Sequence, residues 1–418
     1  IVNENIATDQ RDRFYGNVEV RYDIMPGLYA TGNIYGDNYT LKINERIAEG
    51  SLATSYYKDE LREFTEMNYE ARVHFDKKWE DFSLNAFVGT NRRNRTSFTS
   101  IGQTSGGLIV PGLYSVNNSK DAAVLRTTLS KKRVNSIFGS ASLGYKDLVF
   151  VDLGLRNDWS STLPADNNSY FYPSVTGSFV FSQVVDAPWL SFGKLRAGWS
   201  KVGNDTNPYQ LRETYLNNVF TGTSYLGNPY FLRTLAKANP ELRPESKRSY
   251  EFGVEAQLFK NRVGIDFTYY NEETTDLIMP VTVGAETGYT SRVLNAGRTV
   301  NKGIEAMLTL VPIRKENFEW VSNINFARNR NQVAELAEGL NSLTIGTAPF
   351  NASLVAFPGQ PFGQIYGTDF VYDDAGNKVV NSDGSLLISE CNVVDPGTGT
   401  ISYRVVPASI ANITSYVE

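Results

Sequence analysis

The sequence contains very little cysteine and histidine. Among its 418 residues there is one cysteine, Cys391, and one histidine, His74. A single cysteine excludes an internal disulfide framework and a cysteine-rich metal site. One histidine leaves little for zinc ligation or for a nucleophilic triad. His74 falls at a polar-face position of the expected strand MNYEARVHF, where a solvated or lumen-facing role is favoured over a metal-binding or catalytic one.

Long hydrophobic runs are also missing. No run of 18 or more apolar residues occurs, which excludes a transmembrane helix but not a membrane β-barrel, whose strands are only half apolar. The formal net charge of -5 gives no electrostatic reason to expect a nucleic-acid partner. The opening residues, IVNENIATDQ, lack the basic start and apolar core of a signal peptide, which indicates a mature chain or a fragment.

What the sequence does contain is long stretches of alternating apolar and polar residues. The clearest covers residues 249–277, where the alternation runs for about a dozen positions, turns at FKNR and resumes. Successive strand side chains face opposite sides, so this pattern predicts a long amphipathic β-hairpin. Its strands are about twice the usual length of about 5–6 residues and match the roughly 9–11 residues of a tilted membrane strand. The expected apolar face carries Tyr250, Phe252, Val254, Ala256, Leu258, Val263, Ile265, Phe267 and Tyr269.

Five further pairs of alternating stretches bring the expected number of strands to about twelve. Short turns alternate with long polar segments, among them 38–63, 94–133, 203–247 and 278–298. Bacterial membrane barrels have short periplasmic turns and long extracellular loops, and antiparallel order makes the two alternate. A soluble sandwich has no reason to keep its long loops at one end. The five pairs are 14–24 with 28–37, 64–76 with 82–93, 134–145 with 148–159, 171–182 with 190–203, and 300–313 with 318–330.

The tryptophans agree with a membrane barrel. All of them fall in expected turns or within a few residues of expected strand ends. Amphipathic aromatic rings favour the membrane interface, where the ring is buried and the N–H stays hydrated. Aromatic strand ends in a soluble β-protein are the alternative. The tryptophans are Trp79, Trp159, Trp189, Trp199 and Trp320.

Together these patterns predict an all-β fold, an antiparallel transmembrane β-barrel. Residues 1–331 are expected to supply barrel strands with long extracellular loops, and residues 332–418 an extracellular loop region and an incomplete end of the barrel. The second part holds a helix-like stretch, QVAELAEGL, and a Pro/Gly-punctuated stretch at 356–367. It also holds a cluster at 372–384 that lacks the spacing of a calcium loop and is better explained as a surface hairpin.

Enzyme signatures are missing from the sequence. We find no Walker-type phosphate loop, no G-x-S-x-G elbow, no zinc-binding histidine pair and no dinucleotide fingerprint, so we expect no catalytic residues, no metal and no cofactor. The carboxylates fall on polar strand faces beside basic residues, and a charged wall inside a water-filled lumen explains them more simply than acid/base pairs. They are Asp152, Asp158, Glu251, Glu255 and Glu305, beside Arg156, Lys194 and Arg196.

The long segment 203–247 is the best candidate for ligand binding. Its aromatic side chains stand among Asn, Thr and Gly, where aromatic faces could stack on sugar rings and amides could bond hydroxyls. The alternative is that these aromatics anchor the loop or contact a partner protein. The candidates are Tyr209, Tyr215, Phe220, Tyr225, Tyr230 and Phe231.

Several ordered segments together resemble the SusC/RagA-like TonB-dependent transporters of the Gram-negative outer membrane. Each is weak alone, but their order and spacing across about 135–384 make the resemblance specific. Residues 1–130 fit by pattern only, and about the last 30 residues match nothing we can name. The segments are GWSKVGND at 198–205, the stretch NPELRPESKRSYEF and onward at 239–278, LNAGRTVNKGIEAML at 294–308, FARNRNQVAEL at 326–336 and PGQPFGQIYG at 358–367.

The resemblance implies a barrel of about 22 strands with a plug and a TonB-contacting segment, neither of which lies in these 418 residues. It implies a location in the outer membrane, in contact with its lipid, and an extracellular SusD-like lipoprotein as a lid. It further implies a pair of barrels with two lids, and import of large nutrients, usually oligosaccharides and in some members peptides. The alternatives are a passive porin, a siderophore-type receptor without a lid, and a soluble β-rich carbohydrate-binding or adhesive protein.

Overall fold

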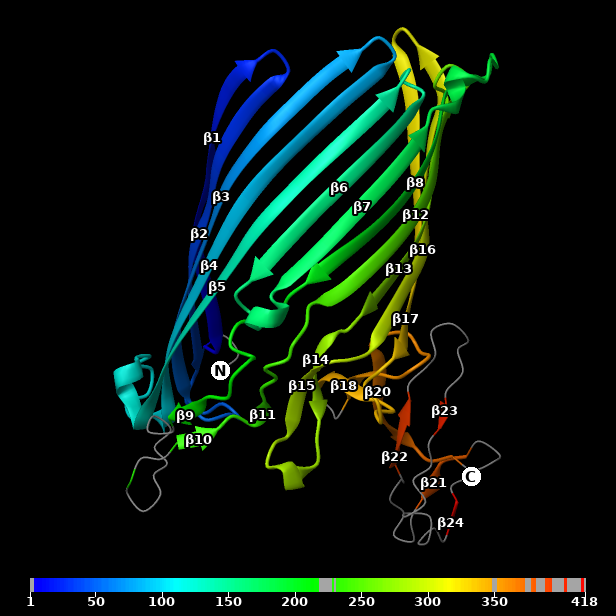
Figure 1. The fold of residues 1–418 in the computed structure, drawn as a ribbon. Coiled ribbons are helices and arrows are strands. Elements are labelled where there is room, and N and C mark those ends of the chain that lie inside the picture. Colours follow the sequence, from blue (N-terminus) through cyan, green and yellow to red (C-terminus); the bar gives the residue numbers. More distant parts are fainter. Residues whose placement is uncertain are drawn as a thin grey trace.

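Twelve strands of the chain form one antiparallel sheet, in which each strand pairs with the preceding and the following one (Figure 1). The computed structural model describes residues 4–217, 228, 231–347, 352–372, 377–380, 388–392, 402–403 and 415–416. The strands of the large sheet are β1 (Ile6–Met25), β2 (Leu28–Ile47), β3 (Tyr56–Trp79), β4 (Phe82–Leu108), β5 (Ser119–Tyr145), β6 (Val149–Ser160), β7 (Ser169–Phe179), β8 (Leu190–Asn204), β12 (Glu245–Leu258), β13 (Val263–Thr275), β16 (Arg298–Lys315) and β17 (Phe318–Glu335).

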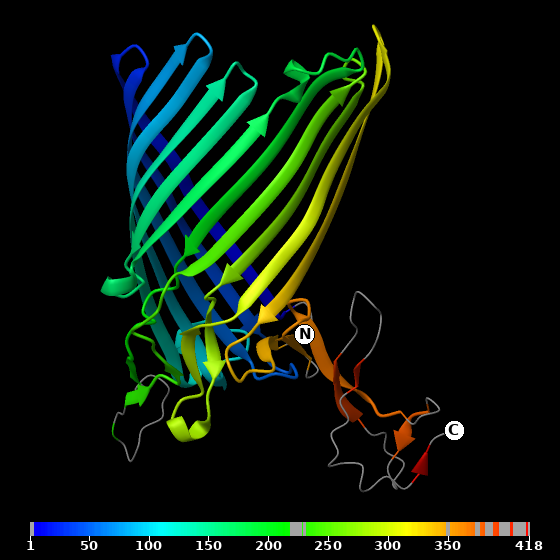
Figure 2. The same cartoon turned by 45° about the vertical axis from the view of Figure 1, so that its right-hand side comes forward.

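The sheet curves into a trough with two different ends (Figures 1 and 2). One end, which we call the short-turn end, carries tight connections such as Pro26–Gly27 and Glu316–Asn317. The opposite, long-loop end carries connections that include residues 205–244 and 276–297. The twelve expected strands and their antiparallel order are therefore confirmed, and the longest connections between them lie at one end of the sheet.

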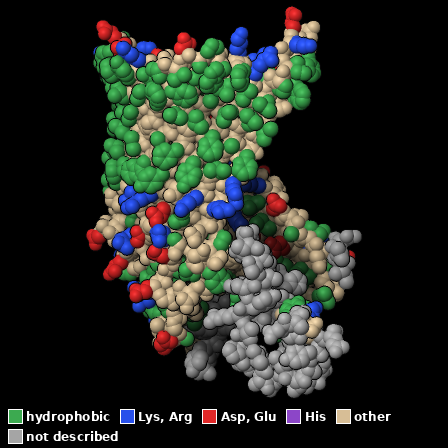
Figure 3. Space-filling view, turned by 90° about the vertical axis from the view of Figure 1, so that its right-hand side faces the viewer, with side chains coloured by type: hydrophobic (Ala, Val, Ile, Leu, Met, Phe, Trp, Pro, Cys, Tyr) green, Lys and Arg blue, Asp and Glu red, His purple; other side chains and the backbone are tan. Residues whose placement is uncertain are grey.

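Strand register places the expected apolar positions on one face. Across β8, β12, β13 and β16, for example, Leu195 is opposite Val254, Val254 is opposite Phe267, and Phe267 is opposite Ala306. Directly paired residues of an antiparallel ladder point to the same side. The same relation holds from β1 to β17, so the convex surface carries a continuous apolar band near the short-turn end (Figure 3). We call these two surfaces the convex face and the concave face.

The tryptophans lie close to the edges of this band. Trp79 is the last residue of β3, Trp159 is next to last in β6, and Trp320 is the third residue of β17. Trp189 lies in the connection before β8, and Trp199 lies within that strand. Their placement agrees with an aromatic girdle at the two boundaries of an apolar layer.

Two of the expected long loops are wrong, because the strands continue through them. The segment 38–63 belongs mostly to β2 and β3, which leaves residues 48–55 as the connection; the segment 94–133 likewise belongs to β4 and β5, with the connection at 109–118. These extensions carry polar residues on both faces, so the apolar alternation ends before the strands do. Cross-strand contacts such as Asn38 Nδ2 to Thr65 Oγ1 at 2.8 Å hold the polar ladder together.

The expected helix at QVAELAEGL is also wrong. β17 runs on to Glu335, because Gln332 and Val333 complete the ladder opposite Val300 and Thr299. Val333 is almost fully buried, and its N–H donates to the carbonyl of Gln360. Tertiary pairing therefore overrides the helical propensity of this short stretch.

Beyond β17 the described residues form a smaller sheet. It contains β18 (Leu343–Thr347), β19 (Ser353–Ala356), β20 (Gln364–Phe370), β22 (Ile388–Asn392) and β23 (Ser402–Tyr403). The turn between β19 and β20 coincides with the Pro/Gly-punctuated stretch. At the expected surface hairpin, Tyr372 forms an antiparallel bridge with Lys378.

Candidate functional site

Three connections pack together at the long-loop end and form a structure that we call the loop platform. It comprises residues 161–168, residues 205–217 and 231–244, and the hairpin of β14 (Ile278–Thr282) and β15 (Ser291–Asn295). Leu163, Leu242 and Val293, one from each connection, form its buried cluster, and Leu242 is fully buried. Tyr170, Leu211 and Ile278 pack around them. The platform thus has a hydrophobic core of its own.

Asp205 ties the platform to the large sheet. Its carboxylate forms an ion pair with Lys132 of β5 and accepts hydrogen bonds from the hydroxyls of Ser160 and Thr162. The side chain of Asp205 is 7% exposed and that of Lys132 is 16% exposed. Because a buried carboxylate needs both a counter-charge and hydrogen-bond donors, this arrangement fixes where the long connection leaves β8.

Tyr289 joins the β14–β15 hairpin to the rest of the platform. Its hydroxyl donates to Glu213 Oε1 at 2.6 Å, and the guanidinium of Arg233 lies 3.9 Å from its ring centroid. Arg233 also donates to the carbonyl of Gly288 at 2.6 Å. The hydrogen bond to Glu213 raises the pKa of Tyr289 above its ordinary value, and burial raises it further. These contacts link segments more than 50 residues apart in sequence.

Three of the six aromatic residues expected to bind ligand belong to the described platform. Tyr209 is 63% exposed, Tyr215 is 70% exposed and Phe231 is 66% exposed. The hydroxyl of Tyr209 accepts the backbone N–H of Lys131 at 3.1 Å, so this residue anchors the connection to β5. The other three candidates, Phe220, Tyr225 and Tyr230, lie outside the described residues.

Tyr215 and Phe231 are held on one small ribbon. β9 (Tyr215–Asn217) pairs antiparallel with β10 (Phe231–Arg233), so that Tyr215 is opposite Arg233 and Phe231 is opposite Asn217. The register places the side chains of Tyr215, Phe231 and Arg233 on one face of the ribbon, with the two aromatic rings at diagonal positions. Exposed rings on a hydrogen-bonded ribbon, next to an arginine, can bind a flat apolar surface and bond its polar edges.

The concave face carries a wall of paired charges. Arg156 of β6 donates through Nε to Asp158 Oδ1 at 2.8 Å and through Nη2 to Ser136 Oγ at 2.8 Å. Tyr172 of β7 lies against the same pair and bonds both partners. The neighbouring ring of Phe138 lies 5.1 Å from the guanidinium. The carboxylates and basic residues expected to form a lumen wall therefore meet on one face at this point.

A second group of pairs lies further along the wall. Arg196 of β8 bonds Asp266 and Thr268 of β13, and Lys194 forms an ion pair with Glu255 of β12 at 2.9 Å. Gly253 lies directly beneath Arg196; a Cβ there would come within 2.4 Å of Nε. A hollow of about 390 Å³ adjoins this group, and its lining includes Glu305.

The wall also has an aromatic part, which was not predicted. His74 stacks on Tyr29 with ring centroids 4.5 Å apart, and the guanidinium of Arg72 lies 5.2 Å from the ring centroid of Phe87. His74 also contacts Thr31 Oγ1 at 3.2 Å, which confirms its polar-face position. The signal was present, since these residues occupy the non-apolar positions of alternating stretches, but only the register shows which of them meet.

The described residues contain no group of three or more potential ligands that could hold a metal ion. In the same part of the chain, no helix is long and apolar enough to span a membrane.

Comparison with known proteins identifies the family. Residues 3–410 match the family described as TonB dependent receptor-like, beta-barrel. The chain belongs to this family. It is similar to TonB-dependent receptor P26 of Formosa agariphila, with 31% identity over 236 residues, and to receptor P3 of the same organism, with 26% identity over 250 residues. These matches cover 54% and 58% of this chain, but 23% and 25% of the relatives, so the chain spans about a quarter of the length of these relatives.

Solved structures agree on the fold. The RagAB peptide transporter superposes with a TM-score of 0.75 and 17% identity, and the superposition covers 93% of this chain and 44% of that chain. The siderophore receptor PiuA from Acinetobacter baumannii gives a TM-score of 0.52 at 11% identity, over 93% and 59% of the two chains.

Several expectations are thereby confirmed. The chain is a barrel portion of the TonB-dependent receptor family, all-β and antiparallel, with a fold similar to that of the RagAB transporter, and it resides in the bacterial outer membrane. The soluble alternative is wrong. The family consists of receptors and transporters, and the convex apolar band is the surface that faces lipid.

Proposed function

We propose that this chain forms part of the barrel of an importer for large nutrients, an oligosaccharide in the first instance and a peptide as the second possibility. In this proposal residues 1–331 supply transmembrane strands and long extracellular loops, and residues 332–418 belong to the extracellular side. The protein is not an enzyme. It works with a SusD-like lipoprotein lid and is energised by TonB through a plug, and two transporter–lipoprotein pairs form the assembly.

The observation that carries the proposal is the loop platform itself. It is an ordered structure with its own core, and it presents Tyr215 and Phe231 on one face of the β9–β10 ribbon. Exposed aromatic side chains lose little conformational entropy on binding, because each has only two χ angles. A small iron chelate needs no such extended surface, whereas an oligosaccharide or a peptide chain does.

Structural similarity supports an importer of large nutrients over a siderophore-type receptor. The fold is closer to that of the RagAB peptide transporter, at a TM-score of 0.75, than to that of the siderophore receptor PiuA, at 0.52. Membership of the TonB-dependent receptor family also disfavours a passive porin. The lipoprotein partner and the class of cargo are taken from the resemblance and are to be tested on the complete transporter.

The test uses the complete transporter extracted from outer membranes together with whatever it retains. Native mass spectrometry would detect a co-purifying lipoprotein and a trapped glycan or peptide, and the class of trapped ligand decides the cargo. The double variant Tyr215→Ala, Phe231→Ala should then weaken ligand binding by about 30-fold, because each of the two rings contributes of order 1 kcal/mol. Phe362→Ala, at a residue that is also exposed but lies outside the platform, is the matched control.

Binding of the lipoprotein must be measured on the same variants. Unchanged ligand affinity together with loss of the lipoprotein would show that these aromatics belong to a protein interface. Absence of a lipoprotein, of a glycan and of a peptide from the complete transporter, combined with tight binding of an iron chelate, would refute the proposed function.

A further inference from the structure

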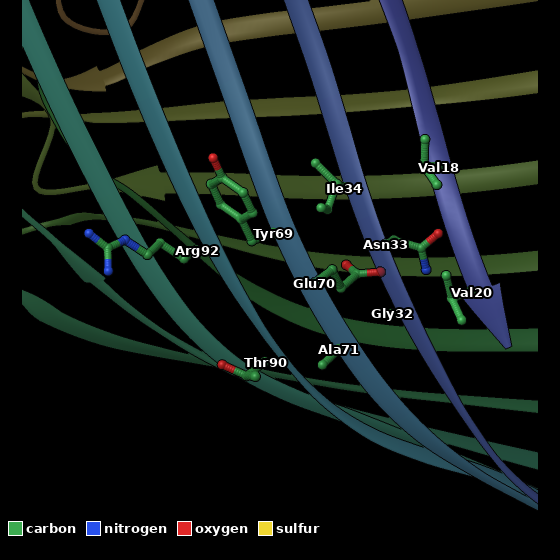
Figure 4. Close-up of a pocket in the computed structure, with 10 residues that line it drawn as sticks. All are labelled: Val18, Val20, Gly32, Asn33, Ile34, Tyr69, Glu70, Ala71, Thr90 and Arg92. Carbon is green, nitrogen blue, oxygen red and sulfur yellow. The ribbon is translucent and has the colours of Figure 1, made fainter. Parts of the chain in front are cut away.

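The lipid-facing wall has a hollow where β1 to β4 pass side by side (Figure 4). Gly32, Ala71 and Thr90 are directly paired across three strands and all point to the convex face. Larger side chains surround them, namely Val18, Val20, Ile34 and Tyr69, and the result is a groove of about 500 Å³.

Nothing within the chain requires a glycine at position 32. A Cβ built there meets no atom within 4 Å, and the backbone is ordinary strand. Glycine weakens a strand because it has no side chain to pack. The groove is therefore open space facing the bilayer, and its apolar lining suits an acyl chain.

A belt of basic residues borders the apolar band on the side of the long loops. Its members all point to the convex face by register and are exposed. On the side of the molecule that Figure 3 shows, basic side chains lie directly below the apolar band. Among the residues that the structure describes, none of them has a carboxylate within ion-pair distance. The belt consists of Arg92, Arg133, Arg248, Lys302, Arg328 and Arg330.

Several arginines on the opposite face do have a carboxylate partner. Arg72, Arg156 and Arg196 on the concave face are each paired with a carboxylate at 2.8 Å or less. Arg residues left unpaired at the edge of an apolar layer are positioned for an anionic partner that comes from outside the chain. The headgroup phosphates of lipids lie at this depth.

Groove and belt meet at Arg92. Arg92 is directly opposite Tyr69, and it lies two residues along β4 from Thr90 of the groove. Arg133 lies on the neighbouring strand β5, opposite Asn94. Arg133 Nε donates to Asn94 Oδ1 at 3.0 Å, which leaves the rest of its guanidinium available. We propose that this place is a binding site for a phosphorylated lipid, with one acyl chain in the groove and the phosphate held by Arg92 and Arg133.

The experiment uses the complete transporter in detergent, titrated with dipalmitoyl phosphatidic acid and, separately, with dipalmitoyl phosphatidylcholine and with inorganic phosphate. Native mass spectrometry counts the bound lipids. We expect the transporter to bind phosphatidic acid about tenfold more tightly than phosphatidylcholine, and to show no retained inorganic phosphate. The double variant Arg92→Gln, Arg133→Gln should abolish this preference, and Arg92→Lys should keep most of it, because the charge stays.

The acyl-chain part is tested by filling the groove. Gly32→Leu should lower the affinity for phosphatidic acid by about tenfold. Gly177→Leu is the matched control, because Gly177 also lies on the convex face and a Cβ there also meets no atom within 4 Å. Equal loss in both leucine variants, equal affinity for the two lipids, or an unchanged preference in the glutamine variant would overturn the proposal. So would a Gly32→Leu variant that dissociates paired barrels while lipid binding is unchanged, because the groove would then belong to a second copy.

Discussion

The loop platform should detach from the sheet when its core is truncated. Leu242 is fully buried between Leu163 and Val293, so Leu242→Ala removes three buried carbon atoms from the centre of a small cluster. Such truncations cost about 2–5 kcal/mol. A cluster of this size cannot reorganise to fill the space, and we expect the free energy of local opening to fall by about 3 kcal/mol. The large sheet contributes Tyr170 of β7 to the edge of this core, but its ladder of backbone hydrogen bonds does not depend on Leu242, so the sheet should stay folded.

Hydrogen–deuterium exchange of the complete transporter measures this local opening. A loss of about 3 kcal/mol should speed exchange roughly 100-fold at backbone amides of residues 236–243 and 278–295, since each 1.4 kcal/mol is a factor of ten. Amides of β12 and β13 serve as an internal reference and should not change. Ligand affinity should fall with the same variant, because Tyr215 and Phe231 are carried by the platform.

Leu235→Ala is the matched control, because Leu235 lies in the same connection but is 65% exposed. Its exchange should resemble that of the wild type. The reasoning is refuted if the two variants behave alike, or if Leu242→Ala speeds exchange in the sheet as much as in the platform, because the platform would then not be a separate unit.

Three further predictions concern polar contacts. Gly253→Ala should push Arg196 away from Asp266 and lower the free energy of unfolding by up to about 1 kcal/mol, measured by thermal melts in detergent. Gly264→Ala is the control and should leave the free energy of unfolding unchanged, because a Cβ there has ordinary contacts. Asp205→Asn should loosen the platform by about 1–3 kcal/mol of opening free energy, measured by exchange, because Lys132 then loses its counter-charge. The neutral hydroxyl of Tyr289 donates to Glu213, which raises the pKa of Tyr289, so this contact should persist past the ordinary tyrosine pKa of about 10 and weaken only above the raised pKa. In a difference absorbance titration of wild type against Tyr289→Phe, a phenolate midpoint at or below 10 would contradict this.

The sequence was sufficient to predict the large sheet, because the hydrophobic pattern of each strand also determines its register with the neighbouring strands. A strand whose apolar residues alternate can face lipid in only one way, and a slip by one residue would turn Phe252 and Val254 to the opposite face. The turns at the short-turn end are tight enough to fix the pairing partner as well. Each pair of strands could therefore be identified from local pattern alone.

The ends of the strands and the platform could not be predicted in this way. Beyond the apolar band both faces of a strand are in water, so Asn38 and Thr65 give no alternation although they are paired. The platform depends on single contacts between distant segments, such as Leu163 with Leu242, and no periodicity marks them. For the binding candidates the outcome is mixed: Tyr215 and Phe231 share one face, Tyr209 anchors the connection, and ligand contact by any of them stays a prediction.

The two faces of the sheet use charge in opposite ways, and this difference follows from what each one meets. On the concave face, pairs such as Arg156 with Asp158 and Lys194 with Glu255 neutralise each other within a few ångströms, so the wall is polar but exerts little field at a distance. Such a wall wets a lumen without trapping a charged cargo. On the convex face Arg92 and Arg328 have no carboxylate partner among the described residues, and their charge is directed to the bilayer boundary. Arg156 and Arg196 are thus paired on the concave face, whereas Arg92 and Arg328 on the convex face have no ion pair among the described residues.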